Sequence, residues 1–415
     1  MAEQQLDVAP NYACCFSDNA NVVDRVDAAI IREEVIRNDS REALSNLLLV
    51  LDQRRPNIIH GESSPQWAPM IARLSRKTFD GYQSVETRPL LDALCSDDSG
   101  GPMNRCRSGS LVALALVVIL ACPNHPPNYP TRPIELHYYA SGPWPVTSSE
   151  SSVPCDSQGN KCVFFYPSNL GANGFLHPIL TWGNGSFGTP QQAEYFLRHM
   201  ASWGFVIVGS EDPMTGPGQT ILDAAKYMVA ANSDSTSPFF HKLNVNQIGS
   251  FGHSQGATGA VNALLKSSGL IKTVVPIEIP AQVWGNSTNF FNPANLTGSI
   301  FFVDGSADFI SPPKQGNNVT GLQSIDAFYQ AVPNSVAKVK GTLIGPSHND
   351  LGGQPGCAQA PFPCVNGVYG YLGYPTAWFM DRLQGDTYAH GAFVNSTGEM
   401  FSETTNWEYV ASNIP

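Results

Sequence analysis

The sequence predicts an α/β protein with a doubly wound, mainly parallel sheet and helices on both faces. Short apolar runs alternate along the chain with longer segments of helical periodicity. Alternation of this kind is typical of a parallel sheet covered by helices. The chain has 415 residues, of which 42% are hydrophobic and 14% charged, and this is enough to bury a sizeable core.

The individual elements follow from the same alternation. Strands are expected near residues 163–166, 178–182, 205–209, 248–251, 273–277, 299–303 and 337–343. Helices are expected near residues 190–203, 219–231, 256–267, 320–331 and 370–384. No long insertion follows the strand at 273–277, so we expect no large lid and an open site.

The pentapeptide GHSQG at residues 252–256 lies between an expected strand and an expected helix. A Gly-x-Ser-x-Gly sequence in this position is typical of the nucleophile elbow of an α/β-hydrolase. The sharp turn presents the serine hydroxyl at a helix N-terminus, where main-chain N–H groups favour negative charge. The sequence therefore predicts an α/β-hydrolase fold with Ser254 as the nucleophile.

The acid should follow a later strand, and the loop after the strand at 299–303 offers two aspartates. Asp308 is the preferred candidate. Asp304 abuts the strand, where it could serve only to cap the turn. Glu278, at the end of the run 273–277, is a third and weaker candidate.

The base should come last in the chain order of this fold. After Asp308 the only histidines are His348 and His390. His348 lies in the loop that follows the strand at 337–343, whereas His390 lies beyond the last strong helix. The predicted triad is Ser254, Asp308 and His348.

With these residues placed, the chain resembles the bacterial cutinase and polyester-hydrolase group of α/β-hydrolases, neighbours of the dienelactone-hydrolase and chlorophyllase-like esterases. The resemblance extends from about Cys155 to about Tyr388. It implies a serine carboxylester hydrolase that forms an acyl-enzyme. The segments that carry it are FFYP (164–167), HPILTWGNG (177–185), LRHMASWGFVIV (197–208), the acid loop at 305–312 and AWFMDR (377–382).

The resemblance also suggests how substrate is held. Main-chain N–H groups of Gln255 and Asn184 are expected to bind the oxyanion. The polyester hydrolases carry an aromatic residue in this loop, where Asn184 stands, and a Trp soon after the Pro that ends the next strand. Here Trp284 comes several residues after Pro276. Trp284 is the candidate substrate-binding residue, and aromatic polyesters are expected to be attacked weakly or not at all.

Composition and spacing exclude several classes of partner. A formal net charge of −11 argues against nucleic-acid binding. The sequence has no phosphate-binding glycine loop with a lysine and no Cys/His spacing that fits a zinc site. We expect no metal, no cofactor, a small or polymeric ester as substrate, and a monomer.

The first part of the chain is unusual. Residues 103–122 combine an Arg-bearing start, an apolar run and a small-residue boundary, as in a signal peptide. Its end resembles a bacterial lipoprotein cleavage box, which makes Cys122 a candidate lipidation site. Residues 1–102 contain nine Arg and one Lys, against five Arg and eight Lys afterwards. We interpret them as a mis-set gene start, with a genuine helical extension as the alternative.

The rest of the chain is divided into a linker and a catalytic domain, and its cysteines indicate two disulfides. A Pro-rich linker and lead-in is expected at 123–150, and the catalytic domain at 151–415. Four cysteines follow Cys122, and their spacing favours two local disulfides, Cys155–Cys162 and Cys357–Cys364. Disulfides fit an oxidising compartment, so a secreted or extracytoplasmic enzyme is expected, with a lipid anchor at Cys122 left open.

Two other functions remain open from the sequence. An acyltransferase would use the same triad to pass the acyl group to an alcohol instead of water. A non-catalytic surface lipoprotein could retain the fold, although it would be expected to show a broken triad.

Overall fold

The computed structural model describes residues 126–352, 357 and 364–415, which fall within one compact unit, His125–Pro415. At its centre is a nine-stranded sheet with the order β1-β2-β4-β3-β5-β6-β7-β8-β9. The strands from β4 to β8 pair in parallel, and β1, β2 and β9 pair antiparallel at the edges. The expected mainly parallel sheet and the α/β-hydrolase fold are confirmed.

The strands are β1 (Val146–Glu150), β2 (Cys162–Pro167), β3 (His177–Gly183), β4 (Val206–Ser210), β5 (Leu243–His253), β6 (Ile271–Ile277), β7 (Ser299–Gly305), β8 (Ala337–Leu343) and β9 (Trp407–Ser412). The α-helices are α7 (Pro133–Tyr139), α8 (Glu194–Ser202), α9 (Gln219–Ala231), α10 (Gln255–Lys266), α11 (Ile325–Ala331), α12 (Gly373–Gln384) and α13 (Thr387–His390). Short 3₁₀ turns are η1 (Ala172–Gly174), η2 (Pro190–Ala193), η3 (Ser287–Asn289), η4 (Pro293–Asn295), η5 (Asp350–Gly352), η7 (Val368–Tyr371) and η8 (Glu399–Phe401).

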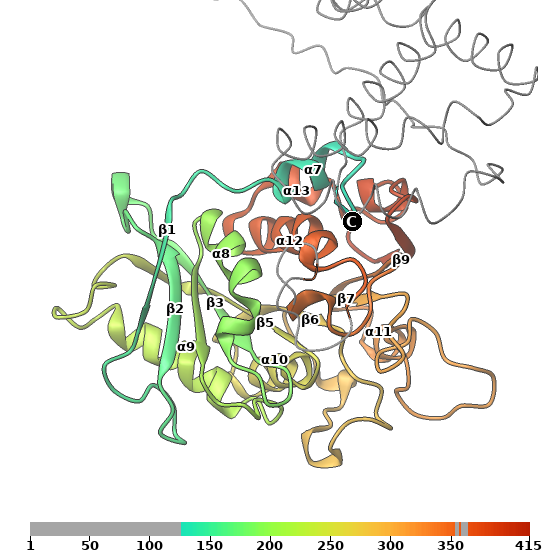
Figure 1. Ribbon diagram of the computed structural model, residues 1–415, viewed down its shortest axis with the longest axis horizontal. Coiled ribbons are helices and arrows are strands. Elements are labelled where there is room, and N and C mark those ends of the chain that lie inside the picture. The colour runs from blue at the N-terminus through green and yellow to red at the C-terminus, as the bar shows by residue number, and fades with distance from the viewer. Residues whose placement is uncertain (1–125, 353–356, 358–363) are drawn as a thin grey trace, which may run out of the picture. The chain divides into compact units, whose positions relative to one another are not determined.

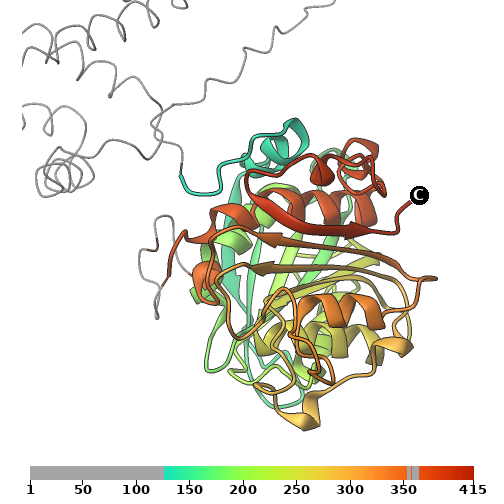
Figure 2. The same ribbon diagram turned by 90° about the vertical axis from the view of Figure 1, so that its right-hand side faces the viewer.

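The core has two layers because side chains alternate across the sheet. In β7, Phe301 and Val303 belong to the core cluster that includes residues of α8 and α12 on one face. Ile300 and Phe302 belong to the cluster that includes residues of α9, α10 and α11 on the other. Every residue of β7 is buried, as expected for a strand covered on both faces. Figures 1 and 2 show the sheet between these two helix layers.

The segment expected as a linker and lead-in, 123–150, is more ordered than the sequence suggested. Its described part contains α7, which packs against α12, and β1, which pairs with β2. The indole N–H of Trp407 donates to Glu135 of α7 across 2.6 Å. Helix α7 has only seven residues, and β1 is a polar, exposed edge strand, so neither has a strong hydrophobic period.

One further difference has a local cause. The helix expected at 320–331 begins at Ile325, because the Ser324 side chain accepts from the N–H of Ala327 and caps it there. The edge strand β9 and helix α13 were not expected. Between β6 and β7 the structure has only η3 and η4, so no large lid is present in this described stretch.

Several predictions concern residues outside the described part of the chain. These are the extension at 1–102, the signal peptide at 103–122 and lipidation of Cys122, and they stay predictions. Within the described residues, no helix combines the length and the apolar character that a bilayer span requires.

A shortened chain that begins at Asn124 should fold and hydrolyse esters as well as the full chain. The reason is that every described strand and the compact unit that contains them lie after this residue. Circular dichroism, thermal unfolding and hydrolysis of a p-nitrophenyl ester would test this. An insoluble or inactive shortened chain would mean that the first 123 residues are needed.

Candidate active site

Ser254 lies at the turn between β5 and α10. Its backbone has φ 56° and ψ −126°, a conformation that is strained for any residue other than glycine. The glycines on either side leave no room for a side chain: a Cβ on Gly252 would lie 2.3 Å from the carbonyl oxygen of Gly256. The main-chain N–H of Ser254 donates to the carbonyl of Ile277 on β6 across 3.1 Å, which anchors the turn to the sheet.

The three residues of the predicted triad are hydrogen-bonded to one another. Nδ1 of His348 lies 2.7 Å from Oδ2 of Asp308, and Nε2 lies 2.8 Å from Oγ of Ser254. Because a carboxylate only accepts, Nδ1 carries the proton and Nε2 accepts from the Ser254 hydroxyl. The arrangement can therefore deprotonate the hydroxyl as it attacks.

Asp308 is held in place by its own loop. Its Oδ1 accepts from the main-chain N–H groups of Ile310 and Ser311 at 2.8 and 3.0 Å, which leaves Oδ2 for His348. Asp304, the competing candidate, is completely buried and accepts from the Thr342 hydroxyl across 2.7 Å. Burial raises the pKa of Asp304 well above its usual value. Asp304 thus joins β7 to β8 instead of orienting the base.

The remaining competitors lie in other environments. His390 is in α13, where Nδ1 lies 3.3 Å from Asp381. Glu278 follows β6 and is completely buried, with Oε2 2.9 Å from Nε2 of His253. Glu278 is therefore close to the base without being bonded to its ring.

The pKa of His348 reflects opposing effects. Burial lowers it most, while the hydrogen bond to Asp308 and the nearby charges of Glu278 and Asp308 raise it, and the net direction is upward. A general base must be neutral to accept a proton. Activity should therefore rise with pH as His348 loses its proton, above the ordinary histidine value of 6.5.

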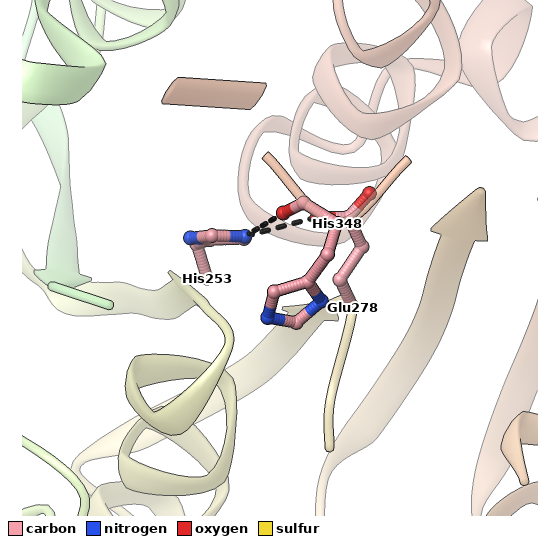
Figure 3. A group of neighbouring side chains, drawn as sticks. All are labelled: His253, Glu278 and His348. Carbon is pink, nitrogen blue, oxygen red and sulfur yellow. Dashed lines mark hydrogen bonds and ion pairs between the residues drawn. The ribbon is translucent and has the colours of Figure 1, made fainter. Parts of the chain in front are cut away.

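One group of side chains has the composition of a metal site. Ligand atoms of His253, Glu278 and His348 lie within 4.8 Å of one another (Figure 3). The ring nitrogens of His348 are hydrogen-bonded to Asp308 and Ser254, however. Nε2 of His253 donates to the His348 carbonyl and lies 2.9 Å from Oε2 of Glu278. A metal ion would have to break these contacts, so the geometry fits a hydrogen-bonded set better than a metal centre.

The loop after β3 forms one wall of the site, and the structure places Asn184 behind that wall. The Asn184 side chain donates to the carbonyls of Ser210 and Asp212 at 2.8 and 2.9 Å, which joins the end of β3 to the loop after β4. The residues of this loop that line the cleft are Ser186 and Phe187.

Two main-chain N–H groups of the loop after β3 differ in whether they make a hydrogen bond. The N–H of Phe187 donates to the carbonyl of Pro213 across 2.9 Å. Within residues 126–352, 357 and 364–415, the N–H of Ser186 makes no hydrogen bond. On the other side of the cleft, the Gln255 side chain donates to the same Pro213 carbonyl across 2.9 Å, and its main-chain N–H belongs to the first turn of α10.

A cleft of about 380 Å³ opens beside Ser254 and is lined largely by apolar side chains. Trp284 lies on its wall, as expected, and is 58% exposed. Its ring makes an edge contact with Phe309, at 5.9 Å between centroids. The other apolar or aromatic lining residues are Phe187, Met214, Pro280, Phe290, Phe291, Ile310 and Phe328.

The loop after β3 contributes an aromatic side chain to the cleft, although Asn184 stands at the position aligned with the aromatic residue of the polyester hydrolases. Phe187 lies three residues after Asn184, lines the cleft and is 81% exposed. The backbone of Phe187 has φ 62°, and this turn directs the Phe187 side chain into the cleft. An alignment centred on Asn184 misses this residue. The only sequence signal was an aromatic residue in a Gly- and Ser-rich turn.

Both expected disulfides are present in the structure. Cys155–Cys162 closes the turn before β2, and Cys357–Cys364 closes the loop beyond His348. Beside the second bridge, the carboxylate of Asp350 accepts from the main-chain N–H groups of Val365 and Gly367 at 3.0 and 2.7 Å. These contacts fasten both ends of the segment that follows His348.

A protein-family match supports both the fold and the chemistry. Residues 130–332 match the PET hydrolase-like family, PETase. The matched range contains Ser254 and Asp308 and ends before His348. No curated protein matches the sequence. The family match confirms the resemblance to cutinases and polyester hydrolases and indicates a hydrolase that acts on esters.

Asp308→Asn should lower kcat by about 10⁴-fold, because an amide no longer fixes the proton of His348 on Nδ1. Asp304→Asn is the matched control, since its side chain bonds Thr342 and not the base. Steady-state hydrolysis of a p-nitrophenyl ester, with thermal unfolding of each variant, would check this. If the Asp304 variant were the inactive one, the acid would have been assigned to the wrong residue.

Proposed function

This chain is an α/β-hydrolase that resembles the cutinases and polyester hydrolases, and on that premise we propose that it is a secreted serine carboxylester hydrolase. The observation that carries the proposal is the pair of contacts at His348, 2.8 Å to Ser254 and 2.7 Å to Asp308. Nucleophile, base and acid are thus already within hydrogen-bond reach of one another.

Acylation begins when Oγ of Ser254 attacks the ester carbonyl and its proton passes to Nε2 of His348. Asp308 stabilises the imidazolium that forms and keeps its orientation. The tetrahedral intermediate collapses, the bond to the alcohol oxygen breaks, and His348 returns the proton to the departing alcohol. An acyl-enzyme on Ser254 remains.

The oxyanion is bound by two main-chain N–H groups, one from Gln255 and one from the loop after β3. Gln255 is the first residue of α10, a helix of 12 residues whose N-terminus favours negative charge. The predicted donor in the loop after β3 is Asn184, and Ser186 is a second candidate, because it lines the cleft and its N–H makes no hydrogen bond within the described residues. Each donor of this kind typically contributes about 10²–10³-fold in rate.

Deacylation repeats the sequence with water as the nucleophile. His348 removes a proton from water, the hydroxyl attacks the acyl carbon, and the ester bond to Ser254 breaks. The hydroxyl of Ser254 regains its proton from His348, and the products are a carboxylic acid and an alcohol. The residues of the triad and the two N–H groups account for each proton and charge.

The cleft supports esters with a bulky apolar or aromatic part as substrates. Phe187 and Trp284 are exposed on the walls of the cleft, and the Trp284 ring makes an edge contact with Phe309. A flat ring between such side chains gains about 0.5–1.5 kcal/mol for each aromatic contact beyond its buried area. With no large lid in the described segment between β6 and β7, a polymer chain could reach Ser254.

Export is supported by the cysteines. The structure joins Cys155 to Cys162 and Cys357 to Cys364, and disulfides persist mainly in oxidising compartments. The proposed location is therefore outside the cytoplasm.

A fluorophosphonate probe should label the chain on Ser254, and Ser254→Ala should abolish both labelling and ester hydrolysis while leaving the fold intact. No other described side chain is placed on an elbow with a histidine at 2.8 Å. Mass spectrometry of the labelled protein and a p-nitrophenyl ester assay would measure this. Activity in the alanine variant above a hundredth of the wild type would contradict it.

The same assay separates hydrolysis from acyl transfer. With glycerol added, a hydrolase should release mainly free acid, whereas an acyltransferase should produce mainly the glycerol ester. A whole triad that fails to label would favour the non-catalytic alternative.

Phe187→Ala and Trp284→Ala should each slow release of terephthalate from an aromatic polyester film by about 2- to 10-fold, the equivalent of one lost ring contact. Release from an aliphatic polyester film should fall less. Leu176→Ala is a matched control, because Leu176 is an exposed apolar residue before β3, at the opposite edge of the sheet. Equal losses on both films would argue against an aromatic subsite.

A further inference from the structure

A second histidine–carboxylate pair lies beside the triad and has no part in the mechanism above. His253 is the last residue of β5 and directly precedes Ser254, and Glu278 directly follows β6. Because His253 pairs with Ile277 in the register of these parallel strands, the two side chains emerge at the same edge of the sheet. Figure 3 shows the His253 ring directed at Glu278 and at the main chain of His348.

One nitrogen makes both contacts. Nε2 of His253 lies 2.9 Å from Oε2 of Glu278 and 2.6 Å from the carbonyl oxygen of His348. A main-chain carbonyl can only accept a hydrogen bond, so Nε2 carries a proton and donates it to the His348 carbonyl, while Oε2 of Glu278 lies beside the same nitrogen without a hydrogen bond of its own. The residue before the nucleophile is thereby bonded to the backbone of the base.

Glu278 is itself held in place. It is completely buried, and its Oε1 accepts from the hydroxyl of Tyr371, which is also completely buried. Its backbone has φ 53°, and its N–H donates to Val303 on β7 across 2.7 Å. A buried carboxyl on a strained backbone costs stability, and such features concentrate at functional sites.

We propose that His253 and Glu278 are positioning residues for His348: His253 fixes the main chain of the loop that carries the base, and Glu278 adds negative charge beside the imidazole. This inference rests on the proposed function, because it assigns a role relative to the base of that reaction. It explains why a carboxyl that is not bonded to the His348 ring is nevertheless kept buried next to it.

The electrostatics agree with this geometry. Burial lowers the pKa of His348, and the bond to Asp308 and the charge of Glu278 raise it. Burial raises the pKa of Glu278, and the nearby His253 opposes that shift. The titratable groups that face this set are Asp308 and, behind it, Asp304 from the β7 side, His253 from β5, Tyr371 from η7 and Asp350 from η5.

Glu278→Gln is the first test. The amide keeps the size of the side chain and removes its charge, so the acid limb of the kcat/KM profile should move to lower pH. The rate of fluorophosphonate labelling should show the same shift, because it reports the protonation of His348 without turnover. Glu135→Gln is the matched control: Glu135 is equally buried and bonded to Trp407, and its replacement should leave the acid limb unchanged.

His253→Phe and His253→Gln form the second test and separate the contact from the volume of the ring. Phe fills the space but cannot donate to the His348 carbonyl, so kcat should fall by about 10- to 100-fold with KM little changed, as for a small misplacement of a catalytic group. Gln can still donate, and it should recover much of that loss.

The outcomes are distinguishable. A wild-type chain that neither labels nor hydrolyses esters would overturn the proposed function itself. An active wild type with an unshifted acid limb in Glu278→Gln, or with equal rates in the two His253 variants, would overturn only the positioning role. If Glu278→Gln does not fold, the two His253 variants decide the question by themselves.

Discussion

The close approach of backbones at the elbow is the constraint on which the rest of the site depends. A Cβ on Gly256 would lie 2.1 Å from the carbonyl oxygen of Gly183, and a Cβ on Gly252 would lie 2.3 Å from that of Gly256. Three segments, the end of β3, the end of β5 and the start of α10, therefore touch through main-chain atoms alone. This contact sets the loop after β3 next to Ser254, so the nucleophile and the wall that bears Phe187 are positioned together.

The parallel strands then bring the other groups to the same edge. Residues that follow β5, β6, β7 and β8 emerge at the carboxyl ends of neighbouring strands, which is where sites form in open α/β sheets. Ser254, Glu278, Asp308 and His348 each follow a different one of these strands. The functional groups thus come from segments far apart in the sequence, and strand order alone makes them neighbours.

The alternation of apolar strands and polar loops explains which parts of the fold and the site could be predicted from the sequence. Each of these strands is an apolar run that ends in a polar loop, so the strands, Ser254, Asp308 and His348 were all recognisable. The position of Phe187 was not, because it depends on one residue with positive φ in a turn. The role of His253 was not either, because it depends on contacts with residues 25 and 95 positions away. Edge strand β1 was missed because polar, exposed strands lack the alternation that identifies a strand.

Asp304 and Glu278 are two buried carboxyl groups near His348 that have similar surroundings but different partners. Burial raises the pKa of both Asp304 and Glu278. Asp304 is bonded to the Thr342 hydroxyl, and its pKa lies well above the usual value, which favours a neutral acid that joins two strands. Oε2 of Glu278 lies 2.9 Å from Nε2 of His253, and this histidine opposes the rise in the pKa of Glu278. In the proposed reaction, positive charge develops on His348 as Ser254 attacks, and a carboxylate already fixed nearby would stabilise that charge without reorganisation. In this proposal one buried acid, Asp304, holds two strands together, and the other, Glu278, supplies negative charge near His348.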